Sequence, residues 1–155
     1  MKKEQIIKIE NKRLIRLVKD NVVQSNDDTV SLTILNKLKN IISNDAENNI
    51  NIDYADLECV LEDSNESYIL SVSLNINELQ SQWNTEIVSD AIEHHKIKNV
   101  LLNVTLNSKM EMLQISKIME MADILVNDDS SVIFGTTIDE NIENDVMEIV
   151  AVIAC

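Results

Sequence analysis

The stretch SSVIFGTTIDENIENDVMEIVAVIAC, residues 130–155, has the pattern that decides the fold. Two apolar runs, 132–138 and 147–154, flank the acidic segment 139–145. Runs of this length, rich in β-branched residues, are typical of β-strands. The stretch therefore predicts two strands joined by an acidic loop.

The segments upstream of this pair alternate between strand and helix patterns. Residues 99–105 (NVLLNVT) predict a strand. Residues 67–74 alternate with a period of two, which predicts a half-buried strand with serines on its second face. Apolar residues at helical spacing predict helices over 53–61, 79–92 and 115–125. This order predicts an α/β fold, an α+β two-layer sandwich whose four-stranded sheet carries helices on one face.

The N-terminal part adds a shorter strand and a long helix. Residues 5–9 predict a strand and 12–18 a helical turn or two. A helix is expected from Asp27 to about Asn44, because Asp27, Asp28 and Thr29 can cap it and apolar residues follow at helical spacing. Residues 44–52 are polar and predict a loop.

Charge and glycine content exclude several classes of function. The 155 residues contain 13 Lys plus Arg against 27 Asp plus Glu, a net charge of −14. That field repels nucleic acid and anionic membrane surfaces, so neither is an expected partner. One glycine and no proline leave no glycine-rich phosphate loop. We therefore expect no tightly bound nucleotide, and no other cofactor, in this chain alone.

The remaining composition favours a cytoplasmic protein. The two cysteines, Cys59 and Cys155, have no metal-ligand spacing, so a reducing compartment is expected and no metal. Charges interrupt the first ten residues before the apolar core of a signal peptide develops. No apolar run approaches the ~20 residues that a membrane-spanning helix needs.

Five motifs in order carry a resemblance to a known family. Ile133-Phe134-Gly135, the acidic segment from Ile138 and the strand ending Val152-Ile153-Ala154 resemble the C-terminal domain of FtsZ, the bacterial relative of tubulin. NVLLNVT (99–105) and KIMEMADIL (117–125) resemble a strand and a helix of that domain. NINIDYADLECVLED (49–63) resembles its synergy loop and following helix. IIKIENKRLIRLVKDN (6–21) resembles the last strand and turn of the FtsZ GTPase domain.

The resemblance also implies a domain division. Residues 1–26 would be a remnant strand and turn of a missing GTPase domain, 27–48 the central helix and its loop, and 49–155 the C-terminal domain. The phosphate loop of the family is absent, and Leu106 and Asn107 stand where the family has glycines after its NVT strand.

The synergy loop supplies the candidate catalytic residues. In the family it enters the nucleotide pocket of the next subunit, so the resemblance implies that Asp53 and Asp56 help hydrolyse GTP in trans, with Asn51 also binding the partner. Spacing alone favours a different role, in which Asp53 caps a helix and Asp56 lies in its first turn. The two roles are compatible.

The acidic segment is the second candidate surface. On general grounds it is a solvated hairpin loop. The resemblance adds a longitudinal contact through Asp139, Glu140 and Asn141, whose partner would be an FtsZ-type subunit or a second copy.

Three functions remain open. The chain could dock on the nucleotide end of an FtsZ-type filament and cap it, because it has one of the two filament surfaces. It could be the C-terminal half of a split GTPase, which the unpaired edge of strand 5–9 favours slightly. It could also be a repurposed domain or a gene fragment. No GTPase activity is expected from the chain alone.

Overall fold

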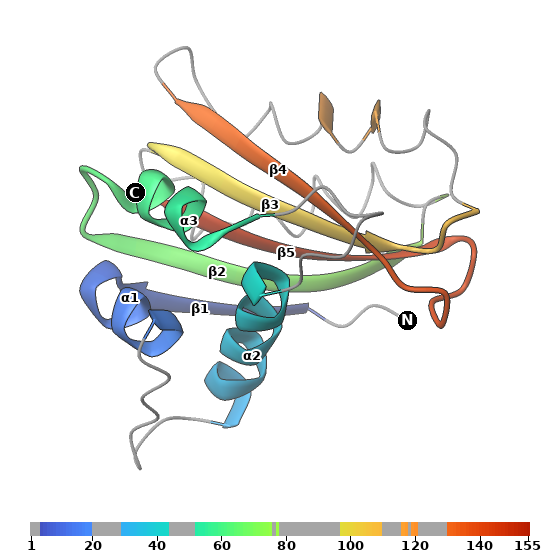
Figure 1. Cartoon of the computed structure of the whole chain (residues 1–155), viewed down its shortest axis with the longest axis horizontal. Coiled ribbons are helices and arrows are strands. Elements are labelled where there is room, and N and C mark those ends of the chain that lie inside the picture. Colours follow the sequence, from blue (N-terminus) through green and yellow to red (C-terminus); the bar gives the residue numbers. More distant parts are fainter. Residues whose placement is uncertain are drawn as a thin grey trace.

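The computed structural model describes residues 4–19, 29–43, 52–75, 77, 97–109, 116–117, 119–120 and 130–155. Three helices and five strands lie in these ranges (Figure 1). The helices are α1 (Asn11–Lys19), α2 (Thr29–Ser43) and α3 (Tyr54–Leu61). The strands are β1 (Glu4–Glu10), β2 (Glu66–Asn75), β3 (Asn99–Leu106), β4 (Ser131–Ile138) and β5 (Val146–Ala154).

The sheet has five strands, in the order β1-β2-β5-β3-β4, rather than the four that the sequence predicts. The additional strand is β1, which pairs antiparallel with β2 from Glu4↔Val72 to Glu10↔Glu66. Lys8 and Glu66 form an ion pair of 3.0 Å across this ladder, and the hydrogen bond that Lys8 donates to Glu66 raises the pKa of Lys8. The N-terminal strand is therefore one of the two edge strands of this sheet, with one side paired.

Strands β4 and β5 are consecutive in sequence but are not neighbours. Strand β3 lies between them, parallel to β4 and antiparallel to β5. The acidic segment is thus a connection that passes the end of β3, and the expectation of a hairpin loop is wrong. In a hairpin the two connected strands pair with each other, whereas here β4 pairs with β3, and β5 pairs with β2 and β3.

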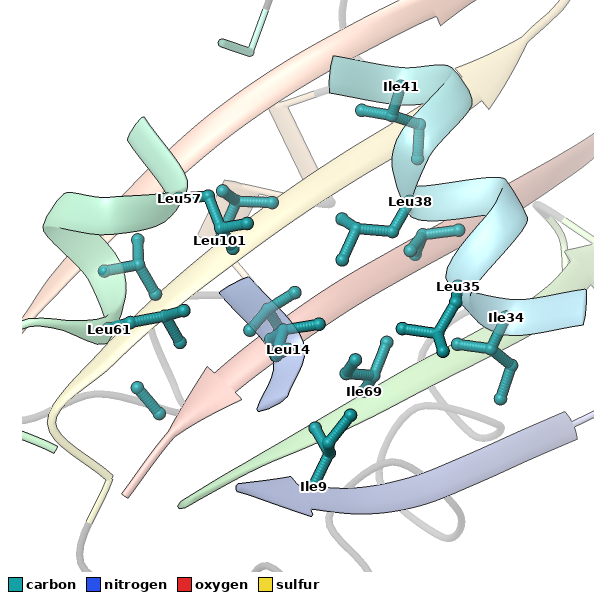
Figure 2. Close-up of a cluster of buried hydrophobic side chains, with 14 of the residues drawn as sticks. Ile9, Leu14, Ile34, Leu35, Leu38, Ile41, Leu57, Leu61, Ile69 and Leu101 are labelled. Carbon is teal, nitrogen blue, oxygen red and sulfur yellow. The ribbon is translucent and has the colours of Figure 1, made fainter. Parts of the chain in front are cut away.

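The three described helices cover one face of the sheet (Figure 1). Figure 2 shows their leucines and isoleucines directed toward Ile9, Ile69 and Leu101 of the strands. The helical spacing predicted for α2 is confirmed, since its buried side chains recur one turn apart: Ile34, Leu35, Leu38 and Ile41. Leu14 of α1 and Leu57 of α3 are also fully buried in this cluster.

Strand β2 is buried on both faces, whereas its alternation predicts a half-buried strand. Ser67 and Ser71 lie on the helix-covered face and are 0% and 5% exposed. Their hydroxyl groups have partners there: Ser67 Oγ donates to Asn11 Oδ1 at 2.6 Å, and Ser71 Oγ accepts from Lys37 Nζ at 3.0 Å. The two serines can be buried because side chains of α1 and α2 provide hydrogen-bond partners for their hydroxyl groups.

The second face of the sheet is apolar as well. Its buried cluster includes Leu70, Val104, Ile149 and Ile153. The expected helix 79–92 lies outside the described residues, as does most of 115–125. Of the latter, Met119 is helical and 47% exposed, so its side chain lies outside the core.

Candidate functional site

The start of α3 is fixed by a capping box. Asp53 is the N-cap residue, with φ −107° and ψ 177°, and its Oδ1 accepts a hydrogen bond of 2.9 Å from the Asp56 amide. In return, Asp56 Oδ2 accepts one of 3.0 Å from the Asp53 amide. Two backbone donors that a helix start leaves unpaired are thereby satisfied. The capping role expected from the spacing is confirmed.

Apolar residues on either side anchor this helix start. Ile52 precedes the cap and is 2% exposed, and Leu57 follows the box and is fully buried in the same cluster. This is the arrangement of a hydrophobic staple. The staple holds the backbone while Asp53 remains exposed and Asp56 half-buried.

Each of the two carboxylates keeps an oxygen outside the capping box. Within the described part of the chain, Asp53 Oδ2 and Asp56 Oδ1 accept no recorded hydrogen bond. Glu58 is exposed one turn along, and α3 has no basic residue in its last turn. The helix start can therefore act as a rigid pair of hydrogen-bond acceptors.

A cation lies beside this acidic helix start. Lys19, the last residue of α1, is exposed, and its Nζ lies 5.7 Å from the centroid of the Tyr54 ring. Tyr54 directly follows the N-cap residue. Sequence reasoning missed this pair, because nothing in the two segments indicates that the end of α1 meets the start of α3.

The acidic segment is held against the end of β3 by a buried asparagine. The Asn107 side chain donates to the carbonyl oxygens of Glu140, at 3.4 Å, and Ile142, at 3.0 Å. Asp139 N donates to the Leu106 carbonyl at 2.9 Å, and Asp139 Oδ1 accepts from Asn141 N at 3.0 Å. The Asn107 side chain and the Leu106 carbonyl thus order this loop.

The predicted partner-binding residues do not form one cluster. The last turn of α3 is tied to the start of β3, where Asn99 Nδ2 donates to the Val60 carbonyl at 3.4 Å. The acidic segment lies at the other end of β3, about 23 Å along the strand at ~3.3 Å per residue. No recorded hydrogen bond or ion pair within the described ranges joins the two segments. Asn51 lies outside the described residues.

A cavity of about 220 Å³ lies between α2 and the sheet. Lys37 and Asn40 line it from α2, and Thr105, Thr137 and Glu148 line it from the strands. Asp139 reaches its rim from the acidic segment. Its walls carry both signs of charge, and it contains no run of backbone amides from a glycine-rich loop.

The single glycine is not part of a phosphate cradle. Gly135 is buried within β4, where it pairs with Asn103 of β3. Among the described residues, no group of three His, Cys, Asp or Glu side chains is placed to hold a metal ion. None of the described helices has the length and apolarity needed to cross a membrane.

Comparisons with known proteins agree with this fold. Residues 80–155 match the model of the FtsZ family, C-terminal domain. The structure is similar to an empty FtsZ dimer from M. jannaschii, with a TM-score of 0.61, 18% identity, and coverage of 94% of this chain and 43% of that one. A tryptophan-to-tyrosine mutant of M. jannaschii FtsZ gives a TM-score of 0.56 at 18% identity, covering 86% of this chain and 43% of that one. The chain thus spans less than half the length of these structures, and at this identity the likeness concerns the fold. A search of curated proteins found no match.

Proposed function

Because this chain is an FtsZ C-terminal-domain-like protein, and so related to a family of cell division, we propose that it docks the start of α3 on the nucleotide-bearing end of an FtsZ-type subunit. Docking there occupies the surface on which the next subunit would add. A protein with one of the two surfaces of a head-to-tail contact terminates growth. The proposed function is therefore capping or modulation of filaments.

The observation that carries this proposal is the rigid carboxylate pair of the exposed Asp53 and the half-buried Asp56. The capping box orients Asp53 and Asp56, and the buried residues Ile52 and Leu57 hold the backbone beneath them. A surface that is ordered before binding loses less conformational entropy when it docks. The pair is thus suited to a specific contact as well as to capping its helix.

The packing of the N-terminal elements supports action as a separate module. Apolar side chains of these elements are buried within the described chain, including Ile9, Leu17 and Leu38. Strand β1 pairs along its length with β2. The described part of the chain therefore does not present these residues to a separate GTPase half.

The acidic segment would be a second contact. Asp139, Glu140 and Asn141 lie in an ordered turn at the end of β3. Asn51 precedes the capping box and would belong to the first contact.

Hydrolysis in trans is the second candidate, and it uses the same two carboxylates. Asp53 and Asp56 would orient the water that attacks the γ-phosphate of GTP on the partner. Phosphoryl transfer requires little more than an oriented water from the side of the attacking nucleophile. GTP would be bound by the partner. In this case the hydrolysis rate rises when the chain is added, whereas simple capping lowers polymer mass.

The experiment is a combined pelleting and GTPase assay with an FtsZ-type protein at increasing ratios of this chain. Wild-type chain should reduce pelleted polymer at substoichiometric ratios. The variants Asp53→Asn and Asp56→Asn should lose the effect, while Glu62→Gln, an exposed acid at the other end of α3, should keep it. Unchanged polymer and hydrolysis at equimolar chain would refute the proposal.

A further inference from the structure

We propose that the exposed face of α1 binds an acidic segment of a partner protein, through cations that lie in one stripe. The basic stripe consists of Lys12, Arg16 and Lys19. It lies on a helix that the docking proposed for α3 does not use. The inference therefore goes beyond the proposed function, and it can be tested on this chain without an FtsZ-type protein.

The stripe follows from the spacing of the cations along α1. Positions 12, 16 and 19 are four and three residues apart, so their side chains are neighbours on one side of the helix. All three residues are exposed, whereas Leu14 and Leu17 are buried on the opposite side. At 1.5 Å per residue the stripe is about 10 Å long. Figure 1 shows α1 at the periphery of the helix layer, beside the end of β1.

The stability of the helix does not explain this arrangement. Helix α1 contains four of the 13 Lys and Arg residues of a chain with a net charge of −14, and it contains no acid. Arg16 and Lys19 are in the last turn, where the helix dipole favours cations, but Lys12 is in the first turn, where the dipole disfavours them. Like charges three or four residues apart also repel each other. A bound anionic segment would offset both unfavourable terms.

No acid within the described ranges neutralises the stripe. Neither Lys12 nor Arg16 has a recorded hydrogen bond or ion pair there, and the ion pair recorded in these ranges joins β1 to β2. The contact recorded for Lys19 is with the ring of Tyr54, at 5.7 Å. An aromatic ring attracts an ammonium group without using its N–H donors. The donors of the stripe are therefore available to carboxylates of a partner.

The size and surroundings of the stripe favour a short acidic segment over an extended polyanion. Duplex DNA carries one charge per ~1.7 Å and continues far beyond a stripe of this length, where it would meet the negative field of the rest of the chain. A bilayer surface is similarly extended, and the leucines of α1 are buried rather than free to insert into lipid. Ile15, three residues from Lys12 and four from Lys19, is half-buried beside the stripe. An acidic segment that also carries apolar residues therefore fits this face.

The test measures binding of the full chain to a fluorescein-labelled amphipathic peptide with glutamates at positions i, i+4 and i+7 and leucines between them. Fluorescence anisotropy should show binding that weakens as NaCl rises from about 0.05 to about 0.3 M. An exposed ion pair contributes roughly two- to fivefold in affinity, so the double variant Lys12→Gln/Arg16→Gln should bind about five- to twentyfold more weakly. Lys12→Arg should bind as wild type does. Lys109→Gln, which changes an exposed lysine outside α1, is the matched control.

Thermal unfolding of the double variant separates binding from stability. We expect an unchanged or higher melting temperature, because the substitutions remove repulsion between like charges. A melting temperature several degrees lower would mark the stripe as structural and overturn the proposal.

The remaining outcomes concern the occupant of the stripe. The proposal is wrong if wild type does not bind the peptide, or if the double variant binds it equally well. Tighter binding of a DNA duplex or of phosphatidylglycerol vesicles than of the peptide would overturn the assignment to a protein segment. A dimer in analytical ultracentrifugation that the double variant loses would make a second copy the occupant, and would overturn it too. None of these results bears on the docking proposed for α3, because the assays contain no FtsZ-type protein.

Discussion

Substitution of Asp53 by alanine or by asparagine separates the capping role of this residue from its role in docking. Alanine removes the acceptor for the Asp56 amide, a hydrogen bond of 2.9 Å. Asparagine caps helices about as well as aspartate but has no charge. Both variants keep the residue-53 amide, so the return bond to Asp56 can persist.

The expected magnitudes follow from this geometry. Loss of an N-cap acceptor costs about 1 kcal/mol, with a range of roughly 0.5–2. For a domain of this size, that lowers the midpoint of thermal unfolding by about 2–4 °C. Asp53→Asn loses only the interaction of its charge with the helix dipole, which is about 0.3–1 kcal/mol at an exposed site. Asp53→Ala is therefore expected to be the less stable of the two.

Urea unfolding followed by circular dichroism measures the stability, and the pelleting assay measures docking. We expect Asp53→Ala to lose stability and docking, and Asp53→Asn to lose docking with most of the stability retained. Equal stability of Asp53→Ala and wild type would refute the capping argument. Full docking activity in Asp53→Asn would show that the carboxylate charge is not needed.

Three further predictions concern other parts of the chain. Leu38→Ala should lower the free energy of unfolding by about 2–5 kcal/mol, because this side chain of α2 is fully buried. Urea unfolding measures this free energy, and a loss below about 1 kcal/mol would contradict this packing. Asn107→Gly should cost about 1–3 kcal/mol by removing two part-buried hydrogen bonds to the carbonyl oxygens of Glu140 and Ile142. Hydrogen exchange should then accelerate in residues 139–145, and unchanged protection would count against the anchoring role. Maleimide at pH 8 should modify Cys59 several-fold faster than Cys155, since Cys59 is exposed and burial raises the pKa of the Cys155 thiol. Mass spectrometry measures the two modification rates, and equal rates would disprove this prediction.

Local patterns were sufficient to predict most elements of this fold. The helical spacing of α2, the acidic cap of α3 and the apolar runs of β3 to β5 depend on residues close in sequence. The same holds for the capping box, which is visible as Asp53 followed three residues later by Asp56. The staple formed by Ile52 and Leu57 could have been predicted from the same stretch.

Pairing between distant segments could not be predicted in the same way. The alternation in β1 indicates a strand but not its partner, so the sequence does not show that β2 has a free edge for it. The sequence of the acidic segment does not show that β3 lies between β4 and β5, the two strands that this segment connects. Lys19 and Tyr54 meet only because α1 and α3 pack on the same face, which neither segment encodes alone.

The place of β5 in the sheet has a consequence for how the chain folds. It is the last described strand in sequence, yet it lies at the centre of the sheet, and it joins the β1–β2 pair to the β3–β4 pair. Ser67 must pair with Ala154, which is more than half of the chain away in sequence, so the contacts that complete the sheet are among the most distant in sequence. Such topologies fold more slowly than those with local contacts. During synthesis the two strand pairs must therefore wait for residues 146–154 to leave the ribosome, with their inner edges open to other chains until then.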